Sequence, residues 1–209
     1  MSGVIYWGLW LLFRMLGSLF FRLRIDGTQV FPKTGGVIVA ANHASFFDIP
    51  LLGCAIPRRV VFLGRANLFP NRLVSWVFQR LGWIPLKTHR LDRKAFGVAL
   101  KYLKSGIPVV IFPEGTRTED GQLQPGRPGI GYLVEESQCQ VIPAYISGTF
   151  KVLPIKAKWP RLFPVTVSFG ELLSFPKSNS TNKKHVYEQI GRSVMEHVAQ
   201  VGGISPPHI

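Results

Sequence analysis

The stretch Gly36-Val37-Ile38-Val39-Ala40-Ala41-Asn42-His43 contains six apolar or small residues in succession and then changes abruptly to polar ones. A short run of this kind, rich in β-branched side chains, predicts a strand that is buried on both faces of a sheet. Three further runs have the same character, namely Arg59–Leu63, Ile107–Phe112 and Gln140–Tyr145. These four runs are therefore predicted to be buried strands.

Stretches with the spacing of helices lie between the predicted strands. They cover Ile49–Ala55, Leu68–Leu81, Leu91–Lys104 and Ile130–Ser137. Strands that alternate with helices predict an α/β fold in a single domain, with a mostly parallel or mixed central sheet and helices packed on it. In such a fold, binding sites form where strands end and loops begin.

The composition combines a large positive charge with a high apolar content. The 209 residues carry a formal net charge of +14 and are 46% hydrophobic, with a mean hydropathy of +0.19. A large positive charge attracts polyanions, and the apolar background favours a lipid headgroup surface over a nucleic-acid groove. The chain has no recognisable zinc-finger or RNA-recognition signature, so no nucleic-acid partner is expected.

An apolar segment, Val4–Phe21, lies near the start of the chain and is interrupted by Arg14. Each uninterrupted half is too short to cross the hydrocarbon core of a bilayer, which counts against a simple spanning helix. At helical spacing the polar and amphipathic residues form one stripe, made of Tyr6, Trp10, Arg14, Ser18 and Arg22. We expect a helix that lies in the membrane interface with its arginines at the headgroups. The alternative is a core helix of a soluble domain, although such helices normally show a wider polar face.

The first polar motif, Asn42-His43-Ala44-Ser45-Phe46-Phe47-Asp48, enters a helix whose first turn can accommodate Pro50. His43 and Asp48 are five residues apart and can meet only if the residues between them form a turn and the helix begins near Asp48. A carboxylate that accepts the Nδ1 proton would leave Nε2 of His43 free to take a proton from a substrate hydroxyl. The alternative is structural, with Asp48 as a helix cap and His43 as a hydrogen-bonded loop histidine.

The second motif, Phe112-Pro113-Glu114-Gly115-Thr116-Arg117, comes at the end of another predicted strand. Pro113 cannot continue central strand pairing, and Gly115 lets a ligand approach the backbone closely. Arg117 then offers a planar fork for a phosphate. Taken alone, the hexapeptide favours the alternative interpretation, a strand-to-loop turn that carries a solvated arginine.

Together the two motifs resemble the signature blocks of the glycerolipid and lysophospholipid acyltransferases, most closely the bacterial-type 1-acylglycerol-3-phosphate acyltransferases. The resemblance also covers the segment from Gly64 to Pro85 and the segment Val141–Gly148, so it extends in order from about residue 25 to residue 170. It implies an acyltransferase catalytic domain, which we place at residues 25–201. The apolar run predicts a membrane-associated helix at residues 1–24, and the Gly- and Pro-rich ending predicts a disordered tail at residues 202–209.

The resemblance also implies roles for individual residues. His43 corresponds to the catalytic base and Asp48 to its orienting partner. Two family positions differ here, because Lys87–Arg90 stands where the family often has Asp-Arg, and Gln124 stands where a basic residue often precedes Pro-Gly. The implied substrate-binding residues are Arg65, Glu114, Gly115, Thr116 and Arg117, with Lys87, Arg90 and Arg127 as substitutes at the positions that differ.

The function implied by the resemblance is transfer of a fatty acyl group to the sn-2 hydroxyl of 1-acylglycerol-3-phosphate, which makes phosphatidic acid in phospholipid biosynthesis. The donor is an acyl thioester, either acyl-CoA or acyl carrier protein, and acts as a co-substrate, so that no cofactor or metal is expected. Within the class, another lysophospholipid or glycerol 3-phosphate is the alternative acceptor. From a different class, a non-catalytic anionic-membrane-binding protein would explain the charge but not the two motifs.

The expected location is a membrane surface on the reducing side, which is the cytoplasmic face of the cell membrane in a bacterial-type cell. The partners expected there are membrane phospholipids, the lysophospholipid acceptor and the acyl donor. Cys54 and Cys139 are the only cysteines, too few for a disulfide framework, and they form no Cys-x-x-Cys pair. Cysteine usage therefore agrees with a reducing compartment.

Overall fold

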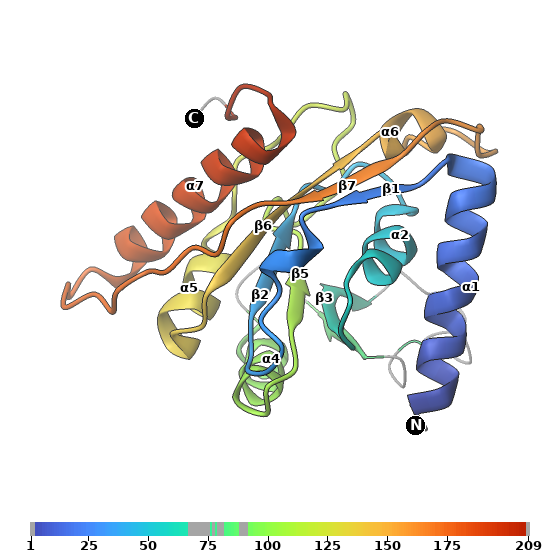
Figure 1. Ribbon diagram of the computed structural model, residues 1–209. Helices are drawn as coiled ribbons and strands as arrows, with labels where there is room; N and C mark the ends of the chain where they lie inside the picture. The colour runs from blue at the N-terminus through green and yellow to red at the C-terminus, as the bar shows by residue number, and fades with distance from the viewer. Residues whose placement is uncertain (1–2, 67–75, 77, 79–81, 88–91, 208–209) are drawn as a thin grey trace.

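The computed structural model describes residues 3–66, 76, 78, 82–87 and 92–207, and the strands among them form one sheet (Figure 1). The strand order is β1-β7-β6-β2-β5-β3-β4. Neighbouring strands are parallel except for the antiparallel pair β6 and β7, so the predicted mostly parallel or mixed sheet is confirmed. The strands are β1 (Arg24–Asp26), β2 (Ile38–Ala41), β3 (Val61–Arg65), β4 (Trp83–Leu86), β5 (Val109–Ile111), β6 (Val141–Ser147) and β7 (Thr166–Phe169).

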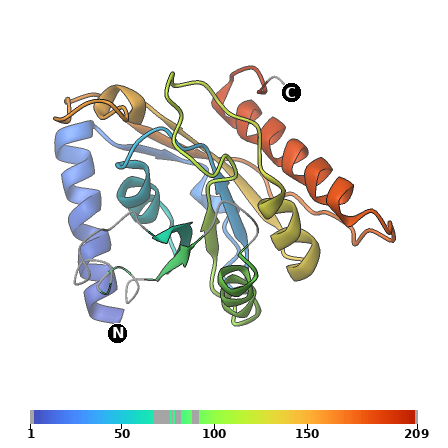
Figure 2. The ribbon, with the colours of Figure 1, turned by 180° about the vertical axis from the view of Figure 1, so that it is seen from behind.

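Helices cover both faces of the sheet, as Figures 1 and 2 show from opposite sides. Side chains of β2 alternate between two hydrophobic cores, with Val39 and Ala41 in one and Ile38 and Ala40 in the other, all fully buried. The first core is closed by α2 (Asp48–Ala55), and the second by α4 (Arg93–Lys104), α5 (Pro128–Ser137) and α7 (Lys183–Gly202). The short helices η1 (Thr28–Val30) and α6 (Thr149–Val152) lie in connections.

The four predicted strands are present as β2, β3, β5 and β6, and three predicted helices are present as α2, α4 and α5. The fourth predicted helix, Leu68–Leu81, falls largely outside the described residues. The sequence did not predict β1, β4 and β7, which are short and lie toward the sheet edges, where fewer side chains need to be buried.

The last helix, α7, was also not predicted, although its signals are in the sequence. Asn182 caps its start by accepting a hydrogen bond from His185 N, and Gly203 ends it with a left-handed backbone (φ +61°). Val186, Ile190 and Val194 recur at four-residue spacing and pack on the sheet. The division of the chain at residues 24 and 201 stays a prediction.

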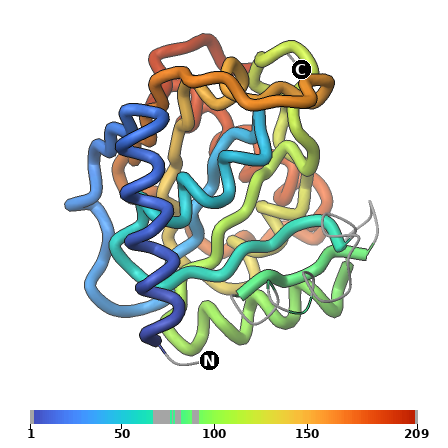
Figure 3. The backbone as a smooth tube through the Cα atoms, turned by 90° about the vertical axis from the view of Figure 1, so that its right-hand side faces the viewer, coloured from blue at the N-terminus to red at the C-terminus, as the bar shows by residue number. Residues whose placement is uncertain are grey.

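The apolar helix α1 (Gly3–Phe21) packs along the outside of the domain (Figure 3). Tyr6, Trp10 and Arg14 of its amphipathic stripe are turned toward the domain, whereas Ser18 and Arg22 are exposed. Tyr6, Trp10 and Arg14 exchange hydrogen bonds with backbone groups of α2 and the segment that follows it. The bonds run from Val60 N to Tyr6 Oη (3.1 Å), from Trp10 Nε1 to Ile56 O (3.0 Å) and from Arg14 Nη1 to Cys54 O (3.3 Å). Arg14 therefore lies against the protein, and its expected position at the lipid headgroups was wrong.

The outward side of α1 is apolar. Within the described residues, this helix is the one that is long and apolar enough to cross a membrane. The polar groups of α1 face the domain because the guanidinium of Arg14 and the indole of Trp10 donate there to backbone carbonyls at the end of α2, which water would otherwise have to satisfy. The exposed large hydrophobic residues of α1 are Val4, Ile5, Trp7, Leu11, Leu12, Phe13, Met15, Leu16, Leu19 and Phe20.

Candidate active site

The first motif brings its histidine and aspartate together at the carboxyl end of β2. Asn42 holds the end of this strand against β6, because its side chain donates to Ile146 O (3.1 Å) and accepts from Ile146 N (2.7 Å). The chain then turns, and α2 begins at Asp48, as the motif required. His43 Nδ1 lies 2.8 Å from Asp48 Oδ2, which leaves Nε2 as the ring nitrogen turned away from the carboxylate.

The Asp48 carboxylate is fixed in place by the turn that precedes it. Besides His43, the backbone amides of Ala44 and Ser45 donate to Oδ2 at 2.7 Å each. The Asp48 side chain is fully buried, whereas that of His43 is 13% exposed. Three donors on one oxygen orient the carboxylate before any substrate arrives, and the histidine ring is oriented with it.

The histidine ring is also held from its flat side. Phe112, at the end of β5, stacks on His43 with ring centroids 4.1 Å apart and planes 14° apart. The ring thus has an edge contact from Asp48 and a face contact from Phe112. Phe112 was quoted in the second motif, but its role against His43 was not predicted, because the two strands that carry these residues pair only in the folded sheet.

Glu114 fastens the loop that carries His43. Its Oε1 accepts from the backbone amide of His43 (2.8 Å), and its Oε2 accepts from the amide of Gln124 (3.3 Å). Only 3% of Glu114 is exposed, and it is not among the residues that line the cleft described below. Glu114 was expected to contact substrate directly, but this geometry instead supports a role in positioning the loop that carries His43.

Burial raises the pKa of Glu114 to about 8, and the charge of Asp48 adds to this effect. The two amide hydrogen bonds, from His43 first and Gln124 second, act in the opposite direction because they favour the carboxylate. A buried group with such a pKa makes the folding free energy depend on pH.

We expect Glu114 to lower the stability of the folded chain as the pH rises from about 5 to about 8. In this range the unfolded chain has released the Glu114 proton while the folded chain still holds it, so each pH unit costs up to ~1.4 kcal/mol. Above a pH of about 8 both states are ionised and the dependence ends. Urea unfolding at several pH values should give a smaller pH dependence for Glu114→Gln than for the native protein. Exposed Glu171 supplies the control, and Glu171→Gln should follow the native curve.

A cleft of about 970 Å³ opens beside His43 and is rich in cations. Among the described residues, four basic side chains line it, and they come from the ends of β3 and β4 and from the loop between β5 and α5. Of the expected residues, Arg90 lies outside the described part of the chain, and Glu114 is turned inward. The expected residues that line the cleft are His43, Arg65, Lys87, Gly115, Thr116, Arg117 and Arg127.

Two of these arginines are held by specific contacts. The guanidinium of Arg117 lies over the ring of Phe46, with Cζ 3.8 Å from the ring centroid. Burial lowers the pKa of Arg117, the charge of Asp48 opposes this effect, and the charge of Arg65 adds to it, so Arg117 lies within electrostatic reach of both residues. Arg127 donates from Nε to Glu114 O (3.0 Å). These contacts restrict the orientation of both guanidinium groups at the wall of the cleft.

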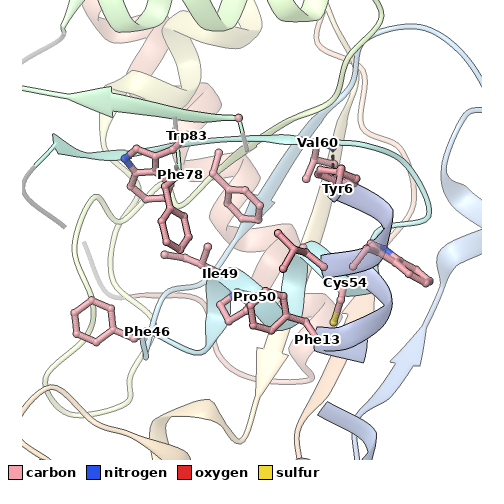
Figure 4. A pocket seen from close by; sticks show the side chains of 14 residues that line it. Tyr6, Phe13, Phe46, Ile49, Pro50, Cys54, Val60, Phe78 and Trp83 are labelled. Carbon is pink, nitrogen blue, oxygen red and sulfur yellow. Dashed lines mark hydrogen bonds between the residues drawn. The ribbon is translucent and has the colours of Figure 1, made fainter. Parts of the chain in front are cut away.

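A second hollow, of about 300 Å³, lies between α1 and α2 and is almost entirely apolar (Figure 4). Phe46, Ile49 and Trp83 line both this hollow and the cleft, so the two are adjacent. The indole ring of Trp83 lies against Gly64 of β3, a position where any side-chain carbon would overlap the ring. No sequence pattern predicted the hollow, because its walls come from several separate segments. They include Tyr6, Trp10 and Phe13 of α1, Pro50 and Cys54 of α2, and Val60, Phe62, Phe78 and Gly82.

Comparison with known proteins extends these observations. A family model described as Acyltransferase matches residues 22–147, which include both motifs and strands β1 to β6. The crystal structure of the 1-acyl-sn-glycerophosphate acyltransferase PlsC from Thermotoga maritima has a TM-score of 0.72 at 26% identity, and the match covers 93% of this chain and 80% of that one.

Two curated relatives are similar over shorter stretches. A chloroplastic 1-acyl-sn-glycerol-3-phosphate acyltransferase of Arabidopsis thaliana is 30% identical over 140 residues, which cover 65% of this chain and 38% of that protein. A lyso-ornithine lipid O-acyltransferase of Pseudomonas aeruginosa is 32% identical over 116 residues, which cover 55% of this chain and 43% of that protein. The match therefore spans less than half the length of either relative.

Proposed function

The chain belongs to the Acyltransferase family, and from this membership we propose that it transfers a fatty acyl group from a thioester to the sn-2 hydroxyl of 1-acylglycerol-3-phosphate. The product would be phosphatidic acid. The observation that carries the proposal is the His43–Asp48 pair, with 2.8 Å between Nδ1 and Oδ2, at the wall of a cleft lined by several basic side chains. A histidine base beside an anion site suits an acceptor that carries both a hydroxyl and a phosphate.

The proposed mechanism is direct transfer with His43 as general base. Nε2 takes the proton of the acceptor hydroxyl while the oxygen attacks the thioester carbonyl, so that a C–O bond forms. The C–S bond then breaks, and the same nitrogen returns the proton to the departing thiolate. Asp48 stabilises the imidazolium between these steps, and no acyl-enzyme is required.

The cations of the cleft are proposed to hold the acceptor phosphate. Arg117 is the first candidate because Phe46 orients its guanidinium and Arg65 is its electrostatic neighbour. A phosphate between two such groups would relieve their mutual repulsion, which lowers the energy of the complex. Anchoring the phosphate also fixes the position of the hydroxyl relative to His43, and such positioning accelerates a reaction between two bound substrates.

We propose that the apolar hollow takes part of an acyl chain. Its walls present almost no polar atoms, and it adjoins the cleft through Phe46, Ile49 and Trp83. An acyl chain buried there is removed from water, which is favourable in proportion to its apolar area. The exposed apolar side of α1 lies next to this hollow, so both lipid substrates could stay near a bilayer on the reducing, cytoplasmic side of a membrane.

A second candidate acceptor is a lyso-ornithine lipid, because the Pseudomonas aeruginosa relative carries that name at 32% identity. The same base would serve this acceptor. The grouping of Arg65, Arg117 and Arg127 in one cleft favours the phosphate-bearing acceptor, since a phosphate can pair with more than one of them at once.

The proposal is tested by measuring product formation with purified protein. Acyl-CoA and acyl carrier protein would be offered as donors, each with 1-acylglycerol-3-phosphate, glycerol 3-phosphate and a lyso-ornithine lipid as acceptors. Phosphatidic acid should be the main product with one of the two donors. A higher kcat/KM for another acceptor would move the assignment to that acceptor, and no transfer with any pair would contradict the proposal.

Arg117→Lys is expected to weaken use of the acceptor. Lysine keeps the charge but loses the planar guanidinium, which can donate two parallel hydrogen bonds and stacks on the ring of Phe46. A hydrogen bond to a charged group is worth ~1.5–3 kcal/mol, so kcat/KM for the acceptor should fall about ten- to hundredfold. Kinetics with acceptor and donor varied separately would measure this.

The control for this variant is Arg192→Lys, because Arg192 is exposed on α7 and does not line the cleft. That variant should match the native enzyme. Normal acceptor kinetics in a folded Arg117→Lys protein, combined with a large rise in the KM of the donor, would assign Arg117 to the donor site instead.

A further inference from the structure

We propose that the loop from Leu153 to Leu162, which follows α6, is a second membrane contact that inserts Trp159 and Leu162 into an anionic bilayer beside α1. The proposal goes beyond the acyl-transfer reaction and does not depend on which acceptor is used. It concerns a surface that lies outside both sequence motifs.

The loop exposes two large apolar side chains within four residues. Trp159 is 82% exposed and Leu162 is 74% exposed, values matched on α1 by Val4 at 81% and Leu19 at 74%. Single exposed apolar residues are common on soluble proteins, but a tryptophan and a leucine together on one loop are less so. Tryptophan is enriched at membrane interfaces because its ring is apolar and its N–H is polar.

Basic residues surround these two side chains. Lys156, Lys158 and Arg161 are all exposed on the same loop. An acidic neighbour, Glu119, pairs with Lys156 at 3.5 Å, but both side chains are mostly exposed, so water and salt weaken the pair. The loop therefore combines apolar side chains with net positive charge, which fits anionic lipid headgroups around a shallow apolar insertion.

The loop has a defined shape of its own. Arg161 N donates to Val152 O (2.8 Å) across its base, and Ala157 N donates to Pro154 O (3.0 Å) within it. Fully buried Val152 anchors the loop to the core at its first end. Because the backbone is held in this way, little ordering is needed before Trp159 meets a membrane.

The loop lies beside the carboxyl end of α1. Val165, just after the loop, donates from its backbone N to Phe21 O (2.8 Å), and Arg24 N donates to Val165 O (3.0 Å). Figures 1, 2 and 3 show, from three directions, the segment after α6 next to this end of α1. Leu19 and Phe20 are exposed at the same end of the helix. One bilayer surface can thus touch the outer side of α1 and the loop together.

Docking through the loop would also place the cleft at the bilayer. Ile155, near the start of the loop, lines the cleft that contains His43. A membrane that holds Trp159 and Leu162 therefore lies next to an edge of the cleft, which suits substrates that arrive from the bilayer. A lipid surface explains this combination of position, charge and apolar side chains better than a protein partner, which would give no reason for continuity with the outer side of α1.

The test is binding of the full chain to vesicles of phosphatidylcholine, with and without phosphatidylglycerol, measured by sedimentation. Trp159→Ala/Leu162→Ala should bind about tenfold or more weakly, because apolar area no longer enters the bilayer. Lys156→Ala/Lys158→Ala should lose binding chiefly to the vesicles with phosphatidylglycerol, and high salt should remove the difference between this variant and the native chain. The matched controls are Val98→Ala/Ile204→Ala for exposed apolar residues and Lys101→Ala/Lys104→Ala for exposed basic residues, and both should bind like the native chain.

Two outcomes would overturn the proposal. In the first, the Trp159 and Leu162 variant binds both vesicles as tightly as its control. In the second, the native chain self-associates through the loop, so that the variant becomes monomeric without any change in vesicle binding.

Activity with short-chain, water-soluble donor and acceptor separates this proposal from the proposed reaction. The Trp159 and Leu162 variant should retain the native rate with these substrates, whereas a loss would overturn a purely membrane-binding role. If the native chain transferred no acyl group at all, the proposed reaction would fail, while the vesicle result would still decide the role of the loop.

Discussion

Replacement of His43 by alanine is expected to abolish acyl transfer while the chain still folds. The proposed general base would be absent, and proton transfer by a positioned side chain typically contributes ~10²–10⁴-fold. The fold should survive because the backbone amide of His43 still donates to Glu114, and Asp48 still accepts from the amides of Ala44 and Ser45. Rates under saturating substrates, together with thermal unfolding, would check both parts.

His197→Ala is the matched control for this variant. His197 is partly buried on α7, contacts Ser193 O through Nδ1 (2.7 Å), and does not line the cleft. It should keep the native rate, which would show that loss of a histidine is not harmful in itself. Native-like turnover by a folded His43→Ala protein would contradict the general-base mechanism.

The contact between His43 and Asp48 could be predicted because its geometry is local. Six residues contain His43, the turn and Asp48, and Pro50 restricts where the helix can begin. The carboxyl ends of β2 and β5 could be predicted as neighbours only in general terms, because strand order is set by tertiary packing. The stacking of His43 on Phe112 and the hydrogen bond from the His43 amide to Glu114 therefore could not be predicted, because they depend on the pairing of β2 with β5.

The orientation of α1 could not be predicted, because periodicity defines a stripe without showing what the stripe faces. The pattern placed Arg14 on the same side as Tyr6 and Trp10, and that part is confirmed by their contacts with the domain. The error was to assign water and headgroups to this side. Free carbonyls near the end of α2, those of Cys54 and Ile56, offered hydrogen-bond acceptors that the sequence pattern does not reveal.

The hollow beside α1 and the loop after α6 were missed for a different reason. The hollow depends on residues that are far apart in the chain, and neither the hollow nor the loop contains a motif with fixed spacing. Trp159 and Leu162 were visible in the sequence, but their exposure follows from the backbone bonds that hold the loop away from the core. Sequence patterns predict elements and local motifs well, whereas surfaces assembled from several elements require the fold.

Replacement of Asp48 by asparagine is the second substitution with a large expected effect. Three donors, His43 Nδ1 and the amides of Ala44 and Ser45, converge on Oδ2. Two of them are backbone N–H groups that cannot accept a hydrogen bond, so the amide oxygen of the asparagine should take this position. The new NH₂ group then occupies the site of Oδ1, which is buried and has no hydrogen-bond partner within the described residues.

This geometry predicts that the Asp48→Asn protein keeps the histidine ring oriented but loses the negative charge that stabilises the imidazolium. Turnover should fall on the order of 10²-fold or more, because the base can no longer be charged at low energetic cost in the transition state. Stability should fall modestly, by ~1–3 kcal/mol, for the unpaired buried NH₂ group. Asp120→Asn is the matched control, since Asp120 also accepts from a turn amide, that of Gln122, but lies outside the cleft. If a folded Asp48→Asn protein turned over at the rate of this control, the charge of Asp48 would be unnecessary and its role would be that of a structural cap for α2.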